Sequence, residues 1–181
     1  MSRDKFKSRS KYNLQFHGLQ VKASGILLYH IVDNELFILV SEKKIRNKKS
    51  SNSDSEEYKI IWEDFGGKVD STDKTIYDTA VRETLEESNF IFNEEYLRAE
   101  IQKIFPQNFA WNADCCYGTF ILPLQEKIDP TILGEKELHD NLDRVCKWVS
   151  YNDFMYYRKK IHIRLKTKKL WTILYNLVHD I

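Results

Sequence analysis

Residues 66–90, GGKVDSTDKTIYDTAVRETLEESNF, join a glycine pair to a strongly acidic segment with a helical period. The spacing of apolar residues predicts a helix over residues 74–88. Asp73 or Thr72 is a candidate N-terminal cap, because short polar side chains accept the first free backbone N–H groups of a helix. Asn89 then stands where a left-handed residue ends many helices. A chain with this segment places several carboxylates on one helix, directly after a strand that ends in glycines.

The predicted helix carries its apolar and acidic side chains on opposite faces. At about 100° per residue, the two faces comprise Tyr77, Val81, Leu85 and Ser88 on one side, and Glu83, Glu86 and Glu87 on the other. A surface ion pair between Arg82 and Glu86 would contribute only a few tenths of a kcal/mol. Glu83 and Glu87 are like charges one turn apart, and acids near a helix C-terminus oppose the helix dipole. A bound divalent cation removes this conflict, because hard cations take carboxylate oxygens as ligands.

The glycine pair fits the same interpretation. A residue without Cβ lets the backbone approach a ligand or an ion closely. Gly66 or Gly67 can therefore offer a carbonyl oxygen to an ion that the glutamates bind. From the residues alone, two interpretations stay open: a metal site and a solvated acidic helix.

Length and charge restrict the remaining possibilities. The 181 residues suggest one domain, and the net charge of +1 argues against tight non-specific binding to nucleic acid or membrane. A basic stretch at residues 158–169 is either solvated surface or a phosphate-binding face. Cys115, Cys116 and Cys146 lack metal-ligand spacing and suit small buried residues in a reducing compartment. The chain shows no signal-peptide pattern and no membrane-spanning run, so a cytoplasmic location is expected.

The order of predicted elements is strands, helix, strands, helix. Residues 1–18 resemble a flexible basic arm, residues 19–181 form the domain, and a polar, Ser-rich loop occupies about residues 46–57. Strands are predicted in LQVKASGILLYHIVDNELFILVSEKK, YKIIWEDFGGK, AEIQKIFPQNF, DCCYGTFILPL and KWVSYNDF, the last running into a turn. An amphipathic helix is predicted over about residues 166–180. This order favours an α/β fold with a mixed sheet and helices on its faces.

The acidic segment resembles the Nudix box, G-x5-E-x7-R-E-U-x-E-E-x-G-U, in which U is aliphatic. RETLEESNF aligns with its second half, so that Arg82, Glu83, Glu86 and Glu87 all match. Asp73 stands in for the first glutamate, and eight residues separate it from Arg82 instead of seven, which indicates a one-residue insertion. Thr84 replaces the aliphatic residue and Asn89 the glycine. The resemblance implies a Nudix-type α/β/α sandwich.

The resemblance also implies an activity: hydrolysis of a phosphoanhydride in a nucleoside diphosphate linked to another moiety. It implies Mg²⁺ or Mn²⁺ on the Gly66 carbonyl, Glu83, Glu86 and Glu87, with Arg82 orienting the glutamates and Glu83 acting either as ligand or as general base. Nucleotide-derived small molecules are the first expectation for the substrate and capped RNA the second. A non-catalytic sensing module is the alternative from another class, and homodimers are common among such relatives.

Further site residues are expected outside the acidic helix. Many members take an additional acid from a loop, and GEKELHDNLDR offers several, of which Glu137 is favoured. Gly67 and Lys68 are expected near the substrate. Trp111 or Tyr117 is a candidate for stacking on a nucleobase, although most aromatic side chains belong to cores.

Overall fold

The computed structural model describes residues 14–46, 58–136 and 143–179. The elements in chain order are β1 (Gln15–Phe16), β2 (Leu19–Gln20), β3 (Ala23–Val32), β4 (Glu35–Arg46), β5 (Tyr58–Glu63), β6 (Phe65–Lys68), α1 (Ile76–Glu87), α2 (Glu94–Ile104), β7 (Phe109–Asn112), β8 (Tyr117–Pro123), the 3-10 turn η1 (Pro130–Leu133), β9 (Val145–Ser150), α3 (Tyr151–Tyr156), the 3-10 turn η2 (Ile163–Leu165) and α4 (Lys168–His179). The predicted loop at residues 46–57, apart from Arg46, and most of the predicted arm lie outside the described residues.

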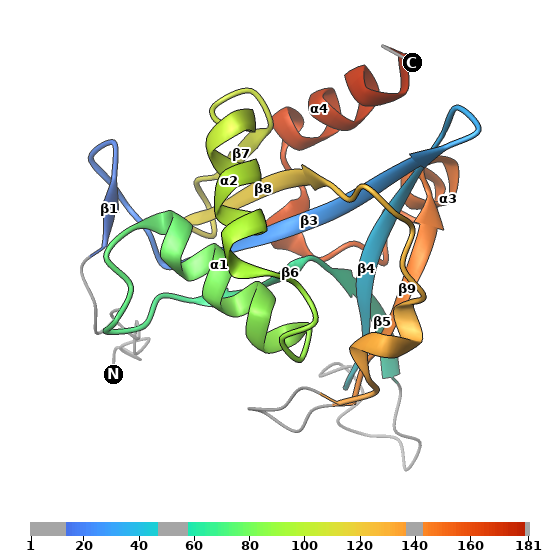
Figure 1. The fold of residues 1–181 in the computed structure, drawn as a ribbon, viewed down its shortest axis with the longest axis horizontal. Coiled ribbons are helices and arrows are strands. Elements are labelled where there is room, and N and C mark those ends of the chain that lie inside the picture. Colours follow the sequence, from blue (N-terminus) through green and yellow to red (C-terminus); the bar gives the residue numbers. More distant parts are fainter. Residues whose placement is uncertain (1–13, 47–57, 137–142, 180–181) are drawn as a thin grey trace, which may run out of the picture.

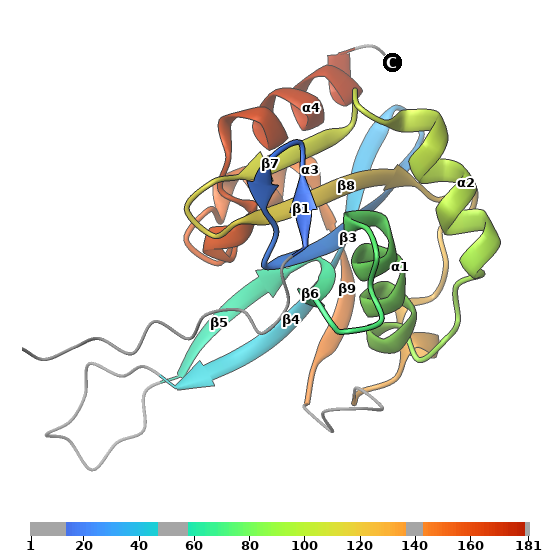
Figure 2. The same ribbon diagram turned by 90° about the vertical axis from the view of Figure 1, so that its left-hand side faces the viewer.

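A seven-stranded mixed sheet forms the middle layer (Figure 1). Its main path runs β5-β4-β3-β8-β7, with β6 paired to β3 and β9 paired to β4. β3 and β8 are parallel, and the other pairs are antiparallel. Helices α1 and α2 lie on one side of the sheet and α4 on the other (Figure 2). The predicted mixed α/β fold with helices on both faces is confirmed.

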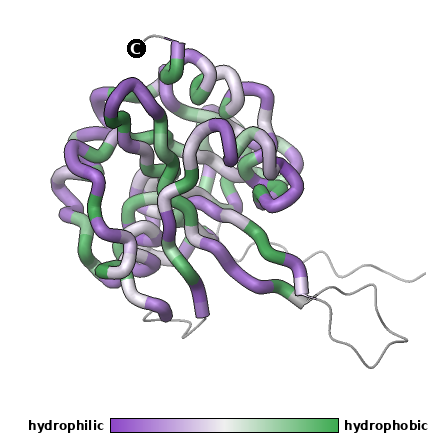
Figure 3. Tube along the Cα trace, turned by 90° about the vertical axis from the view of Figure 1, so that its right-hand side faces the viewer, coloured by the Kyte–Doolittle hydropathy of each residue, from purple (hydrophilic) through white to green (hydrophobic). Residues whose placement is uncertain are grey.

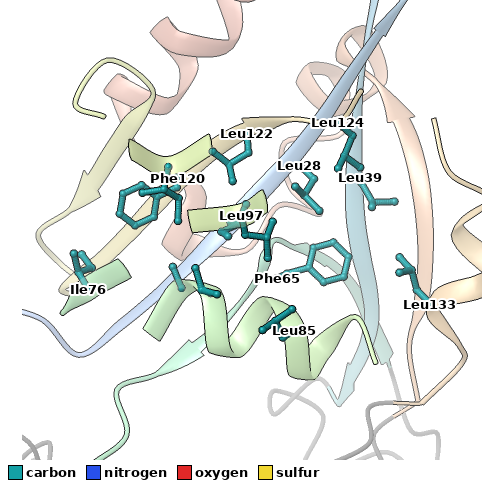
Figure 4. Packing of buried hydrophobic residues seen from close by; sticks show 14 of the residues in the cluster. Leu28, Leu39, Phe65, Ile76, Leu85, Leu97, Phe120, Leu122, Leu124 and Leu133 are labelled. Carbon is teal, nitrogen blue, oxygen red and sulfur yellow. The ribbon is translucent and has the colours of Figure 1, made fainter. Parts of the chain in front are cut away.

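Two apolar clusters hold the three layers together. The first joins one face of the sheet to α1 and α2, and Figure 4 shows its packing around Phe65, Leu97 and Phe120. The second joins the opposite face to α3 and α4 through Phe154, Leu170 and other side chains. Hydrophobic segments accordingly run through the interior of the chain trace, and hydrophilic ones through its turns (Figure 3). Burial of this apolar surface is the main force that fixes the helices on the sheet.

Two successive strands, β5 and β6, lead to the glycine pair and have different partners. β5 pairs with β4, and β6 pairs with β3, so that Gly66 faces Gly25. Asp64 lies at the change of partner and is completely buried. The glycine pair therefore lies at a break in the regular sheet, beneath α1.

At the ends of α1, the predicted N-terminal cap is wrong and the predicted left-handed Asn89 is confirmed. The helix begins at Ile76 and its cap is Thr75, not Thr72 or Asp73: the Asp78 N–H donates to Thr75 Oγ1, and the Thr75 N–H donates to the Asp78 carboxylate. Asn89 has a φ of 54°, as predicted from its place at the helix end. Helix α1 ends just before it, at Glu87, and the Phe90 N–H donates to the Leu85 carbonyl across the helix end.

The prediction of a strand over AEIQKIFPQNF is wrong, because most of this segment belongs to helix α2. Asn93 caps the helix by accepting the Tyr96 N–H, and Glu94 and Glu95 fill its first turn. Leu97 and Ile101, one turn apart, are buried in the first cluster. Only β7, which begins at Phe109, is a strand. The final strand also differs in its end: β9 runs into helix α3 and not into a turn.

Three smaller findings complete the fold. Residues 14–18, assigned to the arm, belong to a short hairpin whose Leu14 is buried. None of the three cysteines forms a disulfide; Cys146 is buried, whereas Cys115 and Cys116 are only half-buried. Within the described part of the chain, no helix has the length and apolar character needed to cross a membrane.

The cap assignment leads to a test. Replacement of Thr75 by Ala removes the acceptor for the Asp78 N–H and should lower the free energy of unfolding by about 1 kcal/mol. Thr72→Ala is the matched control, because Thr72 lies outside the helix and is exposed; it should change stability by less than about 0.5 kcal/mol. Urea unfolding curves measure both. A larger loss for Thr72→Ala would contradict the cap assignment.

Candidate functional site

A hollow of about 490 Å³ opens beneath α1, close to the point where pairing passes from β5–β4 to β6–β3. It is lined by Ala23, Lys43, Gly66, Gly67, Lys68, Glu83, Glu87, Cys115, Tyr117, His162 and Arg164. Its walls therefore come from β3, β4, β6, α1, β8 and the η2 region, and they bring acids and cations close together.

Two glutamates of α1 meet the glycine pair in this hollow. The Gly66 N–H donates to Glu87 Oε2 at 2.8 Å. A Cβ on Gly67 would lie 2.2 Å from Glu83 Oε2, so the Glu83 carboxylate fills the space that any other residue at position 67 would occupy. The glycines thus allow the backbone to approach the carboxylates, as the sequence indicated.

The acids of α1 do not form one exposed stripe, contrary to the predicted arrangement. Glu87 is only 7% exposed and is turned toward the sheet. Glu86 lines a separate trough with Arg82, on the side of α1 that faces α2. Two of the three predicted acids therefore face the hollow.

Arg82 holds its neighbours through five hydrogen bonds. Its guanidinium donates to both oxygens of Asp73 (3.0 and 2.9 Å), to Glu83 Oε1 (2.9 Å), to Glu86 Oε2 (3.0 Å) and to the Lys68 carbonyl (2.8 Å). Burial alone would lower the pKa of Arg82, but Asp73 and Glu83 raise it, so the guanidinium stays charged. All its N–H groups are used within the protein, which makes Arg82 an orienting residue.

The structure assigns a position to Asp73 despite the inserted residue. Its side chain is 2% exposed and forms the two-pronged pair with Arg82. Asp73 Oδ2 also accepts from Thr79 Oγ1 and from the Asp70 N–H. The shorter acid thus ties the loop after the glycines to the middle of α1.

A buried ionic network outside the acidic helix borders the hollow. Lys43 Nζ lies 3.3 Å from Glu87 Oε1 and 3.3 Å from Glu63 Oε2. Arg164 Nε donates to Asp64 Oδ1 at 2.7 Å, and its guanidinium lies 3.9 Å from Glu63. Burial would raise the pKa of Glu63, but Arg164, Lys43 and His162 lower it overall, so this carboxylate stays ionised.

Sequence reasoning missed most of this network, because its members lie on β4, β5 and η2, far from the acidic helix. The adjacent acids in the segment WEDFGG were the only local signal. The structure also places His162 at the hollow, 3.6 Å from Glu63. Burial lowers the pKa of His162, although Glu63 opposes this effect.

The aromatic candidates lie in different surroundings. Tyr117 lines the hollow, but its side chain is 2% exposed: its hydroxyl donates to Asp64 at 2.9 Å, and Arg164 covers its ring at 5.0 Å. This leaves little ring surface for a base. Trp111 packs against the first apolar cluster and does not line the hollow.

Two predicted residues remain. Lys68 is exposed at the rim of the hollow, while its carbonyl is bound by Arg82. Glu137 lies outside the described residues.

The donor set of the hollow fits a hard divalent cation that is held partly by its substrate. Considering only the residues described, no three or more His, Cys, Asp or Glu side chains are grouped to hold a metal ion. Glu83 and Glu87 nevertheless face one hollow beside the Gly66 backbone. Mg²⁺ commonly takes one or two carboxylates and completes its shell with water and substrate phosphates. The arrangement meets that requirement without a complete protein cage.

The anchoring of Arg82 by Asp73 can be tested through stability. Asp73→Asn keeps the shape of the side chain but removes the charge that binds Arg82, and should lower the free energy of unfolding by about 2 kcal/mol. Asp33→Asn, in the exposed turn between β3 and β4, should cost less than about 0.5 kcal/mol. Equal losses in thermal or urea unfolding would show that the pair does not hold the loop.

The chain is similar to several solved structures at low identity. A C. elegans Ap4A hydrolase in a binary complex shares 14% identity, with 88% of this chain and 97% of that chain covered and a TM-score of 0.47. A Listeria monocytogenes protein described as a NUDIX hydrolase shares 16% (89% and 94% covered, TM-score 0.41), and the T. brucei MERS1–RNA complex shares 11% (76% and 54% covered, TM-score 0.43). At these scores the likenesses carry no weight for the fold or the substrate.

The family comparison is stronger. No curated protein sequence matches the chain significantly. The NUDIX domain model, however, matches residues 22–169, which include every described wall of the hollow and all of α1. This match supports hydrolase activity, in a family that generally uses divalent metal ions. The chain therefore belongs to the NUDIX domain family.

Proposed function

We propose that the chain is a metal-dependent pyrophosphohydrolase that cleaves the phosphoanhydride of a nucleoside diphosphate linked to another moiety. One observation carries the proposal: Glu83 and Glu87 meet the glycine pair in a hollow that also presents cationic side chains. Acids bind a divalent ion and cations bind phosphate oxygens, so this combination suits a metal-bound pyrophosphate.

The chain's own residues take distinct roles in this proposal. Glu83, Glu87 and the Gly66 carbonyl would hold Mg²⁺ or Mn²⁺, which would neutralise phosphate oxygens and acidify a bound water. Glu86 shares Arg82 with Glu83 but does not line the hollow, so it would join them only by turning toward the hollow. Arg82 fixes the direction of Glu83 through its hydrogen bond, and Gly67 leaves room for that carboxylate.

The proposed substrate contacts lie at the rim. Lys68 is exposed beside the hollow and can reach a phosphate from solvent. Gly67 offers backbone without a side chain at the same edge. Base recognition by Trp111 or Tyr117 has less support, because both rings are engaged in packing.

Capped RNA is the second candidate substrate, and exposed aromatic and basic side chains after α3 favour it. Tyr156 and Tyr157 are 80% and 42% exposed, and Lys160 Nζ lies 4.7 Å from the Tyr157 ring. Lys160 is followed closely by His162, which lines the hollow. Exposed aromatic rings beside cations suit a single-stranded nucleic acid.

Substrate hydrolysis tests the main proposal. The purified chain is incubated with nucleoside triphosphates, dinucleoside polyphosphates, nucleotide sugars and capped RNA, with Mg²⁺ or with Mn²⁺, and the products are separated chromatographically. Glu87→Gln should lower the rate by roughly 100-fold or more, because even outer-shell partners of a metal contribute about 10- to 100-fold. Glu95→Gln, an exposed glutamate of α2, should have no effect.

The outcomes of this assay are distinct. Hydrolysis in one substrate class that requires the metal and Glu87 supports the proposal and identifies the substrate. Hydrolysis that survives both EDTA and Glu87→Gln contradicts it. Binding of nucleotides without turnover of any class would favour a sensing module.

The glycine pair provides a separate test. Gly67→Ala places a Cβ against the carboxylate of Glu83, the end of a side chain and not backbone, so activity should fall at least about 10-fold while the free energy of unfolding changes by less than about 1 kcal/mol. Gly66→Ala is the comparison, because its Cβ would lie 2.5 Å from Gly25 Cα and 2.7 Å from the Ser24 carbonyl; it should destabilise the fold by about 1–3 kcal/mol. Full activity in folded Gly67→Ala would contradict the assigned role of Glu83.

A further inference from the structure

Lys43 lies inside the hollow, next to one of the proposed metal ligands. It belongs to β4 and pairs with Ile61 of β5. Its side chain is only 17% exposed, although lysine is seldom buried without a partner. Its Nζ lies between two carboxylates, 3.3 Å from Glu63 Oε2 and 3.3 Å from Glu87 Oε1.

The two carboxylates need a nearby positive charge. Glu63 and Glu87 are each 7% exposed, so little water screens their repulsion. Buried charges are tolerated when they are paired. Arg164 lies 3.9 Å from Glu63, but it binds Asp64 much more closely, at 2.7 Å. Lys43 therefore bridges Glu63 and Glu87.

A divalent ion on Glu87 would meet this ammonium group directly. Like charges a few ångströms apart in a partly buried site repel strongly. Glu63 offers Lys43 a second partner at the same distance as Glu87, so the lysine can give up Glu87 without losing every anion. Lys43 can thus compete with the metal for Glu87, and Glu63 is the carboxylate that can keep it when the metal binds.

We propose that Lys43 is an internal counter-cation that neutralises Glu87 in the metal-free protein and gives way to the divalent ion when the site is loaded. This inference rests on the proposed function, because it requires Glu87 to bind the metal. Its consequence is that Lys43 stabilises the empty site and weakens the affinity for the metal.

Direct binding of Mn²⁺ to the whole chain tests the proposal. Free Mn²⁺ is measured by electron paramagnetic resonance during titration of the wild type, Lys43→Met, Lys43→Gln and Lys44→Met. Lys43→Gln guards against misfolding, since its amide can still bond to both carboxylates. Lys44→Met is the matched control, because Lys44 follows on the same strand, is exposed and points to the other face.

We expect each Lys43 variant to bind Mn²⁺ roughly tenfold more tightly than the wild type. In EDTA the same variants should melt at a lower temperature, and Mn²⁺ should raise their melting temperature by more than it raises that of the wild type. Lys44→Met should match the wild type in both measurements.

The contrary results separate two failures. A folded Lys43 variant that binds Mn²⁺ with equal or weaker affinity, while the wild type binds it, overturns the counter-cation role. It would leave the proposed function standing and make Lys43 a phosphate contact or a residue that orients Glu87. Absence of Mn²⁺ binding in the wild type and in all variants overturns the metal site, and the proposed function with it.

Discussion

The close approach of α1 to the strand β6 is the contact on which the site depends. The Gly66 N–H donates to Glu87, and the missing side chain of Gly67 leaves the space that Glu83 fills. A larger residue at position 67 would displace the Glu83 carboxylate, and one at position 66 would press on the backbone of β3. The partner change at Asp64 creates the hollow into which they point. The fold thus supplies a backbone, two acids and an opening at a single place.

Ion pairs surround the contact between α1 and β6. Arg82 joins Asp73, Glu83 and Glu86, and Lys43 joins Glu63 and Glu87, so each carboxylate of the proposed metal site has a cation of the chain beside it. Arg164 extends the network to the C-terminal part of the chain. Such pairs hold the carboxylates in place before any ligand arrives. They also mean that a metal ion must compete with side chains of the protein.

Local patterns in the sequence predicted those parts of the structure that short-range physics determines. The period of α1, the left-handed Asn89 and the mixed sheet followed from spacing and residue type. The strand prediction for the α2 segment is wrong because the helix cap, Asn93, and the first-turn acids precede the stretch on which that prediction rests. Lys43, Glu63 and Arg164 could not be predicted, because their contacts depend on how β4, β5 and η2 meet in space. Glu83 and Glu87 line the hollow whereas Glu86 lines the trough beside α2, and this difference likewise depends on how α1 is rotated on the sheet.

The most direct test of this account is the location of bound Mn²⁺ in crystals, measured by its anomalous scattering. The account predicts a peak in the hollow, within coordination distance of Glu83, Glu87 and the Gly66 carbonyl, with Lys43 turned from Glu87 toward Glu63. A peak only in the trough between α1 and α2, or no peak in the hollow at saturating Mn²⁺, would contradict the account.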